Sequence, residues 1–221
     1  ALALGELWFR VPESMRRIFD GSVGDGLMGK DLILNAIGRI GVDGATYRAM
    51  EFEGKAIGEL SMDGRLTVCN MAIEAGAKSG IIAPDSKTVD YVRARSRRPF
   101  QIYESGPDAQ YVETVEFDVT GMEPQVALPH SPMNVRPVSE VAGTEVDQVV
   151  IGSCTNGRME DMRIAARILK GRAVREGLRC IIIPATHGIY LRALGEGLIE
   201  AFARAKAIVS TPTCGPCLGM H

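Results

Sequence analysis

The sequence lacks the features that mark secreted, membrane-spanning and nucleic-acid-binding proteins. It has 5 cysteines in 221 residues, an odd and low number that argues against a secreted disulfide framework and favours reduced thiols in the cytoplasm. No apolar run approaches the roughly 20 residues that span a bilayer, and the N-terminus has no basic segment ahead of an apolar one, as a signal peptide requires. The 25 Lys and Arg nearly balance the 27 Asp and Glu, so no strong basic field favours nucleic acid.

The composition is that of an ordinary globular protein, with 46% hydrophobic and 24% charged residues. Such a chain can form one large domain or two small ones. Residues 120–142 hold four prolines and little periodicity, which is typical of a linker between domains. We therefore expect a first α/β domain at residues 1–125, a proline-rich linker at 126–142 and a second α/β domain at 143–221.

The first part of the chain alternates between helical and strand patterns. Helices are predicted where apolar residues recur every three to four positions, and strands where they alternate or form short runs. The predicted helices are 30–40, ended by Gly41, then 65–77 and 86–95; the predicted strands are 46–53, 80–83 and 111–119. Residues 6–19 suggest a β-hairpin or edge strands, and 54–64 and 96–108 suggest loops.

The second part of the chain has three apolar runs, at 149–151, 181–183 and 207–209, separated by two helical patterns. Strand, helix, strand, helix, strand is the order of parallel strands joined by crossover helices. The predicted fold class is therefore α/β, with two three-layer α/β/α units built on mostly parallel sheets. In open sheets of this kind, ligands bind just beyond the carboxyl ends of the strands.

Three of the cysteines follow these predicted strands. Cys154 lies directly after the first run, and Cys214 and Cys217 lie after the third, about sixty positions later. Because parallel strands end at the same edge of a sheet, we expect the three thiols to share that edge. Cys69 and Cys180 fall within apolar patterns and are interpreted as core residues.

Three thiols at one edge favour a metal or cluster site, and the residues alone leave its kind open. A thioredoxin-like redox pair is disfavoured because Cys214 and Cys217 do not open an early helix. Zinc in a closed structural site takes four ligands, which His187 could complete. A [4Fe–4S] cluster on Cys154, Cys214 and Cys217 would leave one iron without a protein ligand, able to act as a Lewis acid on oxygen.

Asn70 and Glu74 are four residues apart on the predicted helix 65–77, so they share one face, together with Thr67. The plain interpretation is a solvated helix face. The functional interpretation is a carboxylate that acts as acid or base, with an amide to orient it. The pattern by itself favours neither.

Five segments of the sequence resemble the aconitase family. They are I-G-S-C-T-N at 151–156, C-G-P-C-L-G at 214–219, G-V-D-G-A-T-Y-R-A-M-E-F at 41–52, M-D-G-R-L-T-V-C-N-M-A-I-E-A-G at 62–76 and G-I-I-A-P-D at 80–85. The resemblance extends over essentially the whole chain. It is strongest to the large subunits of the 3-isopropylmalate dehydratase and prokaryotic homoaconitase branches, and the residues do not decide between them.

This resemblance implies a hydro-lyase that moves a hydroxyl group between adjacent carbons of a di- or tricarboxylic acid by dehydration and rehydration. It implies a [4Fe–4S] cluster held by Cys154, Cys214 and Cys217, with one iron free of protein ligands. It also implies that Asn70 and Glu74 are an active-site amide and carboxylate.

The chain matches only the two middle domains of that family, which are its domains 2 and 3. The family's N-terminal domain, the Asn-Arg segment after C-G-P-C-L-G and the swivelling substrate-binding domain have no counterpart here. In the isomerase branch the swivelling domain is a separate small subunit, so the resemblance implies that partner and a hydroxy acid substrate, but no nucleic acid or membrane. We expect a fragment that is inactive by itself.

Two other functional classes compete with the hydro-lyase interpretation. One is a non-catalytic α/β module with structural zinc on the three cysteines, which metal analysis separates from an iron–sulfur protein. The other is an RNA-binding regulator, which the near-neutral charge of the chain makes remote.

Overall fold

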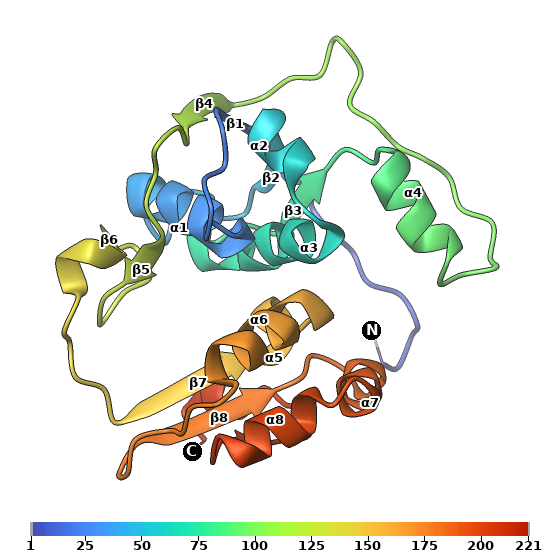
Figure 1. Cartoon of the computed structure of the whole chain (residues 1–221). Helices are drawn as coiled ribbons and strands as arrows, with labels where there is room; N and C mark the ends of the chain where they lie inside the picture. The colour runs from blue at the N-terminus through green and yellow to red at the C-terminus, as the bar shows by residue number, and fades with distance from the viewer. Residues whose placement is uncertain (1, 221) are drawn as a thin grey trace. The chain divides into compact units, whose positions relative to one another are not determined.

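The computed structural model describes residues 2–220, which form two compact units that meet between Val138 and Ser139 in the sequence (Figure 1). Each unit is a mixed α/β structure whose main sheet is entirely parallel. The predicted α/β class with mostly parallel sheets is therefore confirmed. The boundary between the units lies at Val138, within the stretch for which the sequence predicted a linker. Among the described residues, no helix is long and apolar enough to cross a bilayer.

The first unit contains a four-stranded sheet, a short hairpin and the helices that connect them. Its elements are β1 (Ser14–Asp20), α1 (Gly29–Ile40), β2 (Ala49–Glu53), α2 (Lys55–Glu59), α3 (Met62–Met71), the 3-10 helix η1 (Ala72–Ala75), β3 (Ser79–Ile82), α4 (Ser86–Arg93), β4 (Glu113–Asp118), β5 (Gln125–Ala127) and β6 (Val135–Pro137). The short helix η2 (Val138–Val141) spans the boundary between the units. Five predicted helices and strands of this unit, α1, β2, β3, α4 and β4, are present within a few residues of their expected bounds.

Strand β1 is an inner strand of the first sheet, which has the order β3-β2-β1-β4. The hairpin or edge strands predicted for residues 6–19 are therefore wrong. Met15, Arg17 and Phe19 alternate along β1 and are fully buried. The pattern was hard to interpret because one of the three is an arginine, whose guanidinium reaches Glu113 Oε2 at 2.6 Å.

The core of the first unit lies between its sheet and helices α1 and α3. Phe19 stacks on Phe117 with ring centroids 4.6 Å apart, and Phe52 lies 6.4 Å from Phe19. Leu32, Ile33, Ala36 and Ile37 from α1 and Val68 from α3 join the same cluster of buried residues. Burial of one apolar face of α1 against the strands explains why its pattern was clear in the sequence.

The other face of the first sheet is polar and lies under a loop, where the prediction placed a helical layer. Arg16 forms an ion pair with Glu53, with 2.6 Å between Nε and Oε1. Ser105 and Tyr111 from the loop donate hydrogen bonds to the Glu51 carboxylate, at 2.8 Å to Oε2 in both cases. Helix α4 buries no residue.

The proline-rich stretch is more ordered than a linker. Strands β5 and β6 form an antiparallel hairpin held against the start of α1. The buried Asp31 carboxylate accepts hydrogen bonds from the backbone N–H of Gln125 at 2.8 Å and of Met28 at 2.7 Å, and from Lys30 Nζ at 2.5 Å. Prolines at 124, 129, 132 and 137 end the strands early, so the hairpin is too short to give a periodic signal.

Two further predictions for the first unit are corrected. Residues 54–64 were expected to form a loop, but they contain α2 and the start of α3, whose N-cap Ser61 accepts from Gly64 N at 3.0 Å. The helix predicted at 65–77 ends as α3 at Met71 and tightens into η1. Because the 3-10 turn changes the direction of the following side chains, Ile73 is 64% exposed and not buried as expected.

The second unit has a three-stranded parallel sheet of order β7-β8-β9. Its elements are β7 (Gln148–Gly152), the single turn α5 (Ser153–Asn156), α6 (Met159–Leu169), β8 (Arg179–Ile183), α7 (His187–Gly195), α8 (Leu198–Arg204), β9 (Ile208–Val209) and η3 (Pro216–Leu218). The alternation of strands and helices predicted for this part is confirmed.

One face of the second sheet is covered by α6 and α8, which contact each other. Met162, Ala165 and Phe202 from these helices pack on Cys180 and Ile182 from β8. The expected core position of Cys180 is therefore confirmed. On the other face, Val150 and Ile208 are paired across the sheet through Ile181, and they are 38% and 52% exposed.

Candidate functional site

The carboxyl edge of the second sheet carries all three cysteines predicted to bind a cluster. Cys154 lies in α5, directly after β7, and Cys214 and Cys217 follow β9. Because β7, β8 and β9 are parallel, their carboxyl ends lie at the same edge. Each of the three thiols is exposed and free of a disulfide.

The backbone around Cys154 adopts an unusual conformation. Gly152 has φ 123°, and a Cβ atom on it would lie 1.9 Å from the carbonyl oxygen of Ile183. Ser153 has φ 65°, in the left-handed region that side chains rarely adopt. Such strain persists where the surroundings hold it, and it collects at functional sites. The turn ends at Gly157, whose carbonyl accepts from Ala185 N at 2.8 Å, which ties the cysteine loop to the end of β8.

Ser153 links the two cysteine segments. The Cys217 thiol donates to Ser153 Oγ at 3.5 Å, across 64 residues of sequence, and Ser153 is only 4% exposed. This contact brings the C-G-P-C segment to the residue that precedes Cys154. No local pattern in the sequence could reveal the contact between Ser153 and Cys217.

Asp161, in the first turn of α6, is a residue next to this loop that sequence reasoning missed. Its buried carboxylate accepts from Asn156 Nδ2 at 3.0 Å and from the backbone N–H of Arg158 at 2.9 Å. It therefore fixes the end of the cysteine loop to the first turn of α6. The acidic side chain three residues after the helix N-cap Arg158 is the sequence signal that could have identified it.

The donor chemistry of this edge fits a thiolate-bound group, although the thiols are not gathered into a ligand set. Within residues 2–220, no three His, Cys, Asp or Glu side chains approach one another closely enough to hold a metal ion. His187, considered as a fourth zinc ligand, begins α7 and is exposed. Two features agree with a thiolate-bound group. The three thiols are exposed, and the strained turn and the Ser153 contact bring two segments that are distant in sequence to one edge of the sheet.

Asn70 and Glu74 lie in the first unit. Asn70 is near the end of α3 and Glu74 is in η1, and both are exposed. Ala75 and Gly76, which follow them, accept hydrogen bonds from the backbone N–H groups of Ala45 and Tyr47 ahead of β2. The pair therefore lies toward the amino edge of the first sheet. Because the two units are separate bodies, the assignment of Asn70 and Glu74 to the cysteine site stays a prediction.

Of the two remaining cysteines, Cys180 is buried, as expected, whereas Cys69 is only partly buried and is not the core residue that the sequence suggested. Burial raises the pKa of the Cys69 thiol from 9.0 to about 11, although the nearby Arg65 charge opposes this shift. Burial also raises the pKa of Cys180. A thiol that stays protonated is a poor metal ligand and a poor nucleophile, so neither cysteine belongs to the candidate site.

Together, these features define a parallel α/β protein with exposed thiols beyond the strands of its second sheet. Comparison with known proteins gives the family. A model of the aconitase family (aconitate hydratase) matches residues 1–221, and the chain belongs to that family.

The curated relatives are similar over the full length of this chain. The chain is 60% identical over 220 residues to the 3-isopropylmalate dehydratase large subunit of Heliobacterium modesticaldum, and 61% identical over 219 residues to that of Desulfitobacterium hafniense. These alignments cover 100% and 99% of this chain and 52% of each relative. The chain therefore spans about half the length of the curated relatives it matches.

A solved structure agrees in fold. The crystal structure of aconitase X from Thermococcus kodakaraensis, in its holo-form, matches with a TM-score of 0.50 and 13% identity. The match covers 92% of this chain and 44% of that protein. At this level of identity, the likeness supports the α/β architecture.

Proposed function

We propose that this chain is part of the large subunit of a hydro-lyase that isomerises 3-isopropylmalate. The observation that carries the proposal is the identity of about 60% over the whole chain to large subunits with that name. Homocitrate-type acids are the less supported substrates, because the relatives described above are all 3-isopropylmalate dehydratases. The complete activity requires the other half of the large subunit and a small subunit as its partner.

In this proposal, Cys154, Cys214 and Cys217 would hold a [4Fe–4S] cluster. When bound, such a cluster supplies one iron without a protein ligand, a Lewis acid that polarises a hydroxyl group. The residues of this chain contribute position. Gly152 and Ser153 turn Cys154 outward at the end of β7, and Ser153 draws Cys217 toward it. Exposed thiols remain reduced most readily in the cytoplasm, where we place the protein.

Glu74 is proposed as the group that exchanges a proton with the departing hydroxyl. Its carboxyl would protonate that oxygen as the carbon–oxygen bond breaks, while a base outside this chain removes the proton from the neighbouring carbon. On rehydration, Glu74 would take a proton back from water and that base would return its proton to carbon. The Asn70 amide would hydrogen-bond to the same substrate and hold it in register. Both side chains are exposed, which leaves them accessible to a substrate and to the remaining parts of the enzyme.

The experiment is anaerobic reconstitution of the full-length polypeptide that contains these residues, followed by iron and acid-labile sulfide analysis. We expect near-equal iron and sulfide and a broad visible band, both lost in the variants Cys154→Ser, Cys214→Ser and Cys217→Ser. Cys180→Ala is the matched control, because this thiol is buried in the core, and its cluster content should equal that of the wild type.

Substrate turnover then tests the reaction. With the small subunit present, the loaded enzyme should convert 3-isopropylmalate, and Glu74→Gln should lower kcat about 100-fold or more while the cluster content stays unchanged. Tight zinc without sulfide in the reconstituted protein contradicts the proposal and supports a structural metal site. Full turnover by Glu74→Gln removes that residue from the mechanism.

A further inference from the structure

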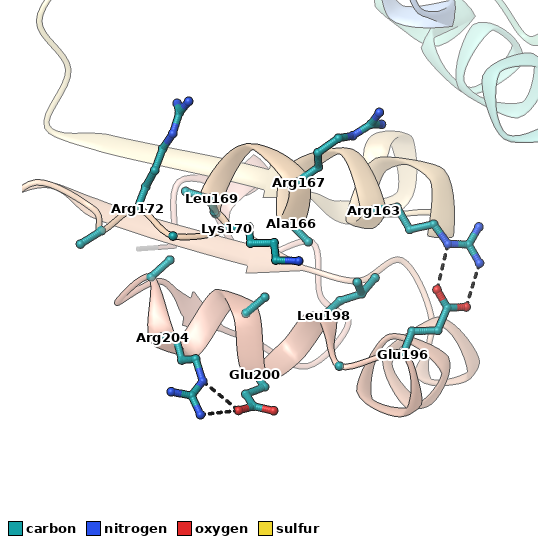
Figure 2. A pocket seen from close by; sticks show the side chains of 15 residues that line it. Arg163, Ala166, Arg167, Leu169, Lys170, Arg172, Glu196, Leu198, Glu200 and Arg204 are labelled. Atoms are coloured by element: carbon teal, nitrogen blue, oxygen red, sulfur yellow. Dashed lines mark hydrogen bonds and ion pairs between the residues drawn. The ribbon is translucent and has the colours of Figure 1, made fainter.

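The second unit contains a groove between α6 and α8 that the cysteine site does not use (Figure 2). Its volume is about 850 Å³. The floor is apolar and built from small or aliphatic side chains: Ala166, Leu169, Leu198, Ala201 and Ala205. Ala166 and Ala205 are almost completely buried. Two helices with small residues between them leave a trough into which another helix can fit closely.

The rim of the groove is basic, although the whole chain is slightly acidic, with a formal charge of −2. Five basic and two acidic side chains line it: Arg163, Arg167, Lys170, Arg172, Arg204, Glu196 and Glu200. Both acids are already neutralised. Arg163 reaches Glu196 at 2.7 Å, and Arg204 reaches Glu200 at 2.6 Å, as Figure 2 shows.

Three basic side chains of the rim are not neutralised by an acidic side chain within the described residues. Arg167, Lys170 and Arg172 form no ion pair among the described residues. In Figure 2, Lys170 extends into the space between α6 and α8, whereas Arg167 on α6 and Arg172 just after the end of α6 point away from α8. The groove therefore offers an apolar floor and one ammonium group within it, and the two guanidinium groups lie on the side of α6 away from α8.

We propose that this groove docks an acidic amphipathic helix from a second polypeptide. The floor matches an apolar stripe with anchors at i, i+3 or i+4 and i+7, and Lys170 within the groove matches a carboxylate that flanks such a stripe. Helix α6 has 11 residues and is roughly 16 Å long at 1.5 Å per residue, so a partner helix of about three turns fills the groove.

Other occupants fit less well. A nucleic acid would place phosphates against an apolar floor and against two carboxylates at the rim. A small anion would use Lys170 and leave most of the 850 Å³ unfilled. The proposal concerns the face of α6 and α8, and it does not depend on which hydroxy acid the enzyme converts.

The test uses the full-length polypeptide that contains these residues and a fluorescein-labelled 14-residue probe peptide. The peptide has leucines along one helical face and glutamates on both sides of them; a scrambled peptide of the same composition is the control. Fluorescence anisotropy should show saturable binding of the amphipathic probe that weakens with salt. Lys170→Glu should weaken it about 10-fold, since one attractive charge becomes repulsive inside the groove.

Two further variants separate the groove from general charge. Ala201→Trp places a large ring on the apolar floor, and it should also weaken binding at least about 10-fold. Arg93→Glu makes the same change in net charge on α4 of the first unit, and binding should stay within about twofold of the wild type. Circular dichroism verifies that each variant is folded.

The proposal is overturned if the probe shows no binding up to about 1 mM, because a Kd of that size corresponds to a binding free energy of only about −4 kcal/mol. It is also overturned if the scrambled peptide binds equally well, or if Arg93→Glu weakens binding as much as Lys170→Glu does. Tighter binding of a single-stranded oligonucleotide that competes with the peptide would assign the rim to nucleic acid instead. Loss of cluster in reconstitution leaves the proposal untouched, because the groove and the thiols lie on different elements.

Discussion

The two units of this chain share an architecture but differ in how completely their sheets are covered. The first unit buries three phenylalanines between four strands and two helices, and a polar loop covers its other face. In the second unit, α6 and α8 cover one face of the sheet; on the other face Ile181 is buried, but its neighbours Val150 and Ile208 are 38% and 52% exposed. The first unit therefore covers both faces of its sheet, whereas the second leaves part of one face exposed and presents a strained edge with exposed thiols.

A substitution in the core of the first unit should give the largest loss of stability. Phe19→Ala removes a fully buried ring that stacks on Phe117 at 4.6 Å, and it should lower the free energy of unfolding by about 4 kcal/mol. Hydrogen exchange measured by mass spectrometry should show lost protection in β1, β2 and β4. Unchanged protection in β8 is the control, and its loss would show that the units do not fold separately.

The turn before Cys154 should be nearly as sensitive. Gly152→Ala places a Cβ atom 1.9 Å from a backbone oxygen that cannot move away alone, so we expect a loss of about 3 kcal/mol in the second unit, measured by urea denaturation. Gly171→Ala is the matched control, because Gly171 also has positive φ but open space around it. It should lose about 1 kcal/mol. Equal losses would show that the close approach to Ile183 is unimportant.

The rate of alkylation should differ between the exposed cysteines and the two less exposed ones. Because the pKa of Cys69 is about 11, two units above its ordinary value of 9.0, its thiolate at pH 8 should be about 100-fold less abundant than that of an unperturbed thiol. Pulsed alkylation with peptide mapping should therefore modify Cys154, Cys214 and Cys217 first. Early modification of Cys69 or Cys180 in the folded protein would contradict the lower exposure of these two thiols.

The ion pair between α3 and α4 should make the first unit sensitive to acid. Arg65 is almost fully buried and grips Asp85 with two hydrogen bonds of 2.6 and 2.8 Å, which hold the pKa of Asp85 well below its usual range. Asp85→Asn keeps the helix cap and removes the charge, and it should cost about 1–2 kcal/mol at pH 7 because Asp85 is half exposed.

The sign of the pH dependence follows from that shift. A carboxyl whose folded pKa is lowered stabilises the protein above its unfolded pKa of about 3.9. The stabilisation is lost as the pH falls further toward the folded value. Denaturation of the wild type and of Asp85→Asn should therefore differ at pH 7 and converge in strong acid. A difference that stays constant below pH 4 would show that the Asp85 charge is not its source.

The contact between Ser153 and Cys217 should give the smallest effect. Ser153→Ala removes the acceptor of a weak thiol hydrogen bond at 3.5 Å but keeps the strained backbone, so we expect a loss of about 0.5–1 kcal/mol in the second unit. Pulsed alkylation of Cys217 should become faster, while that of Cys154 stays the same. An unchanged rate at Cys217 would mean that the contact does not hold the segment in place.

Local sequence patterns predicted many helices and strands of the first unit. They missed the elements whose positions depend on contacts with residues distant in the sequence. The apolar stripe of α1 was clear because its face packs on one layer of strands. Strand β1 was misassigned because Arg17 is buried in it, and the ion pair that helps to make that burial tolerable is with Glu113, 96 residues away. The hairpin of β5 and β6 was missed because Asp31, on α1, holds it in place.

The sequence by itself determined the order of the elements in the second unit, the parallel direction of its strands and the position of three cysteines beyond strand ends. These follow from periodicity, turn residues and the handedness of crossover connections, which are local properties. Only the tertiary structure decided that β1 is an inner strand, that Ser153 meets Cys217 and that α6 and α8 leave a basic groove. Such features depend on contacts between residues far apart in the chain, so the pattern of any one segment cannot predict them.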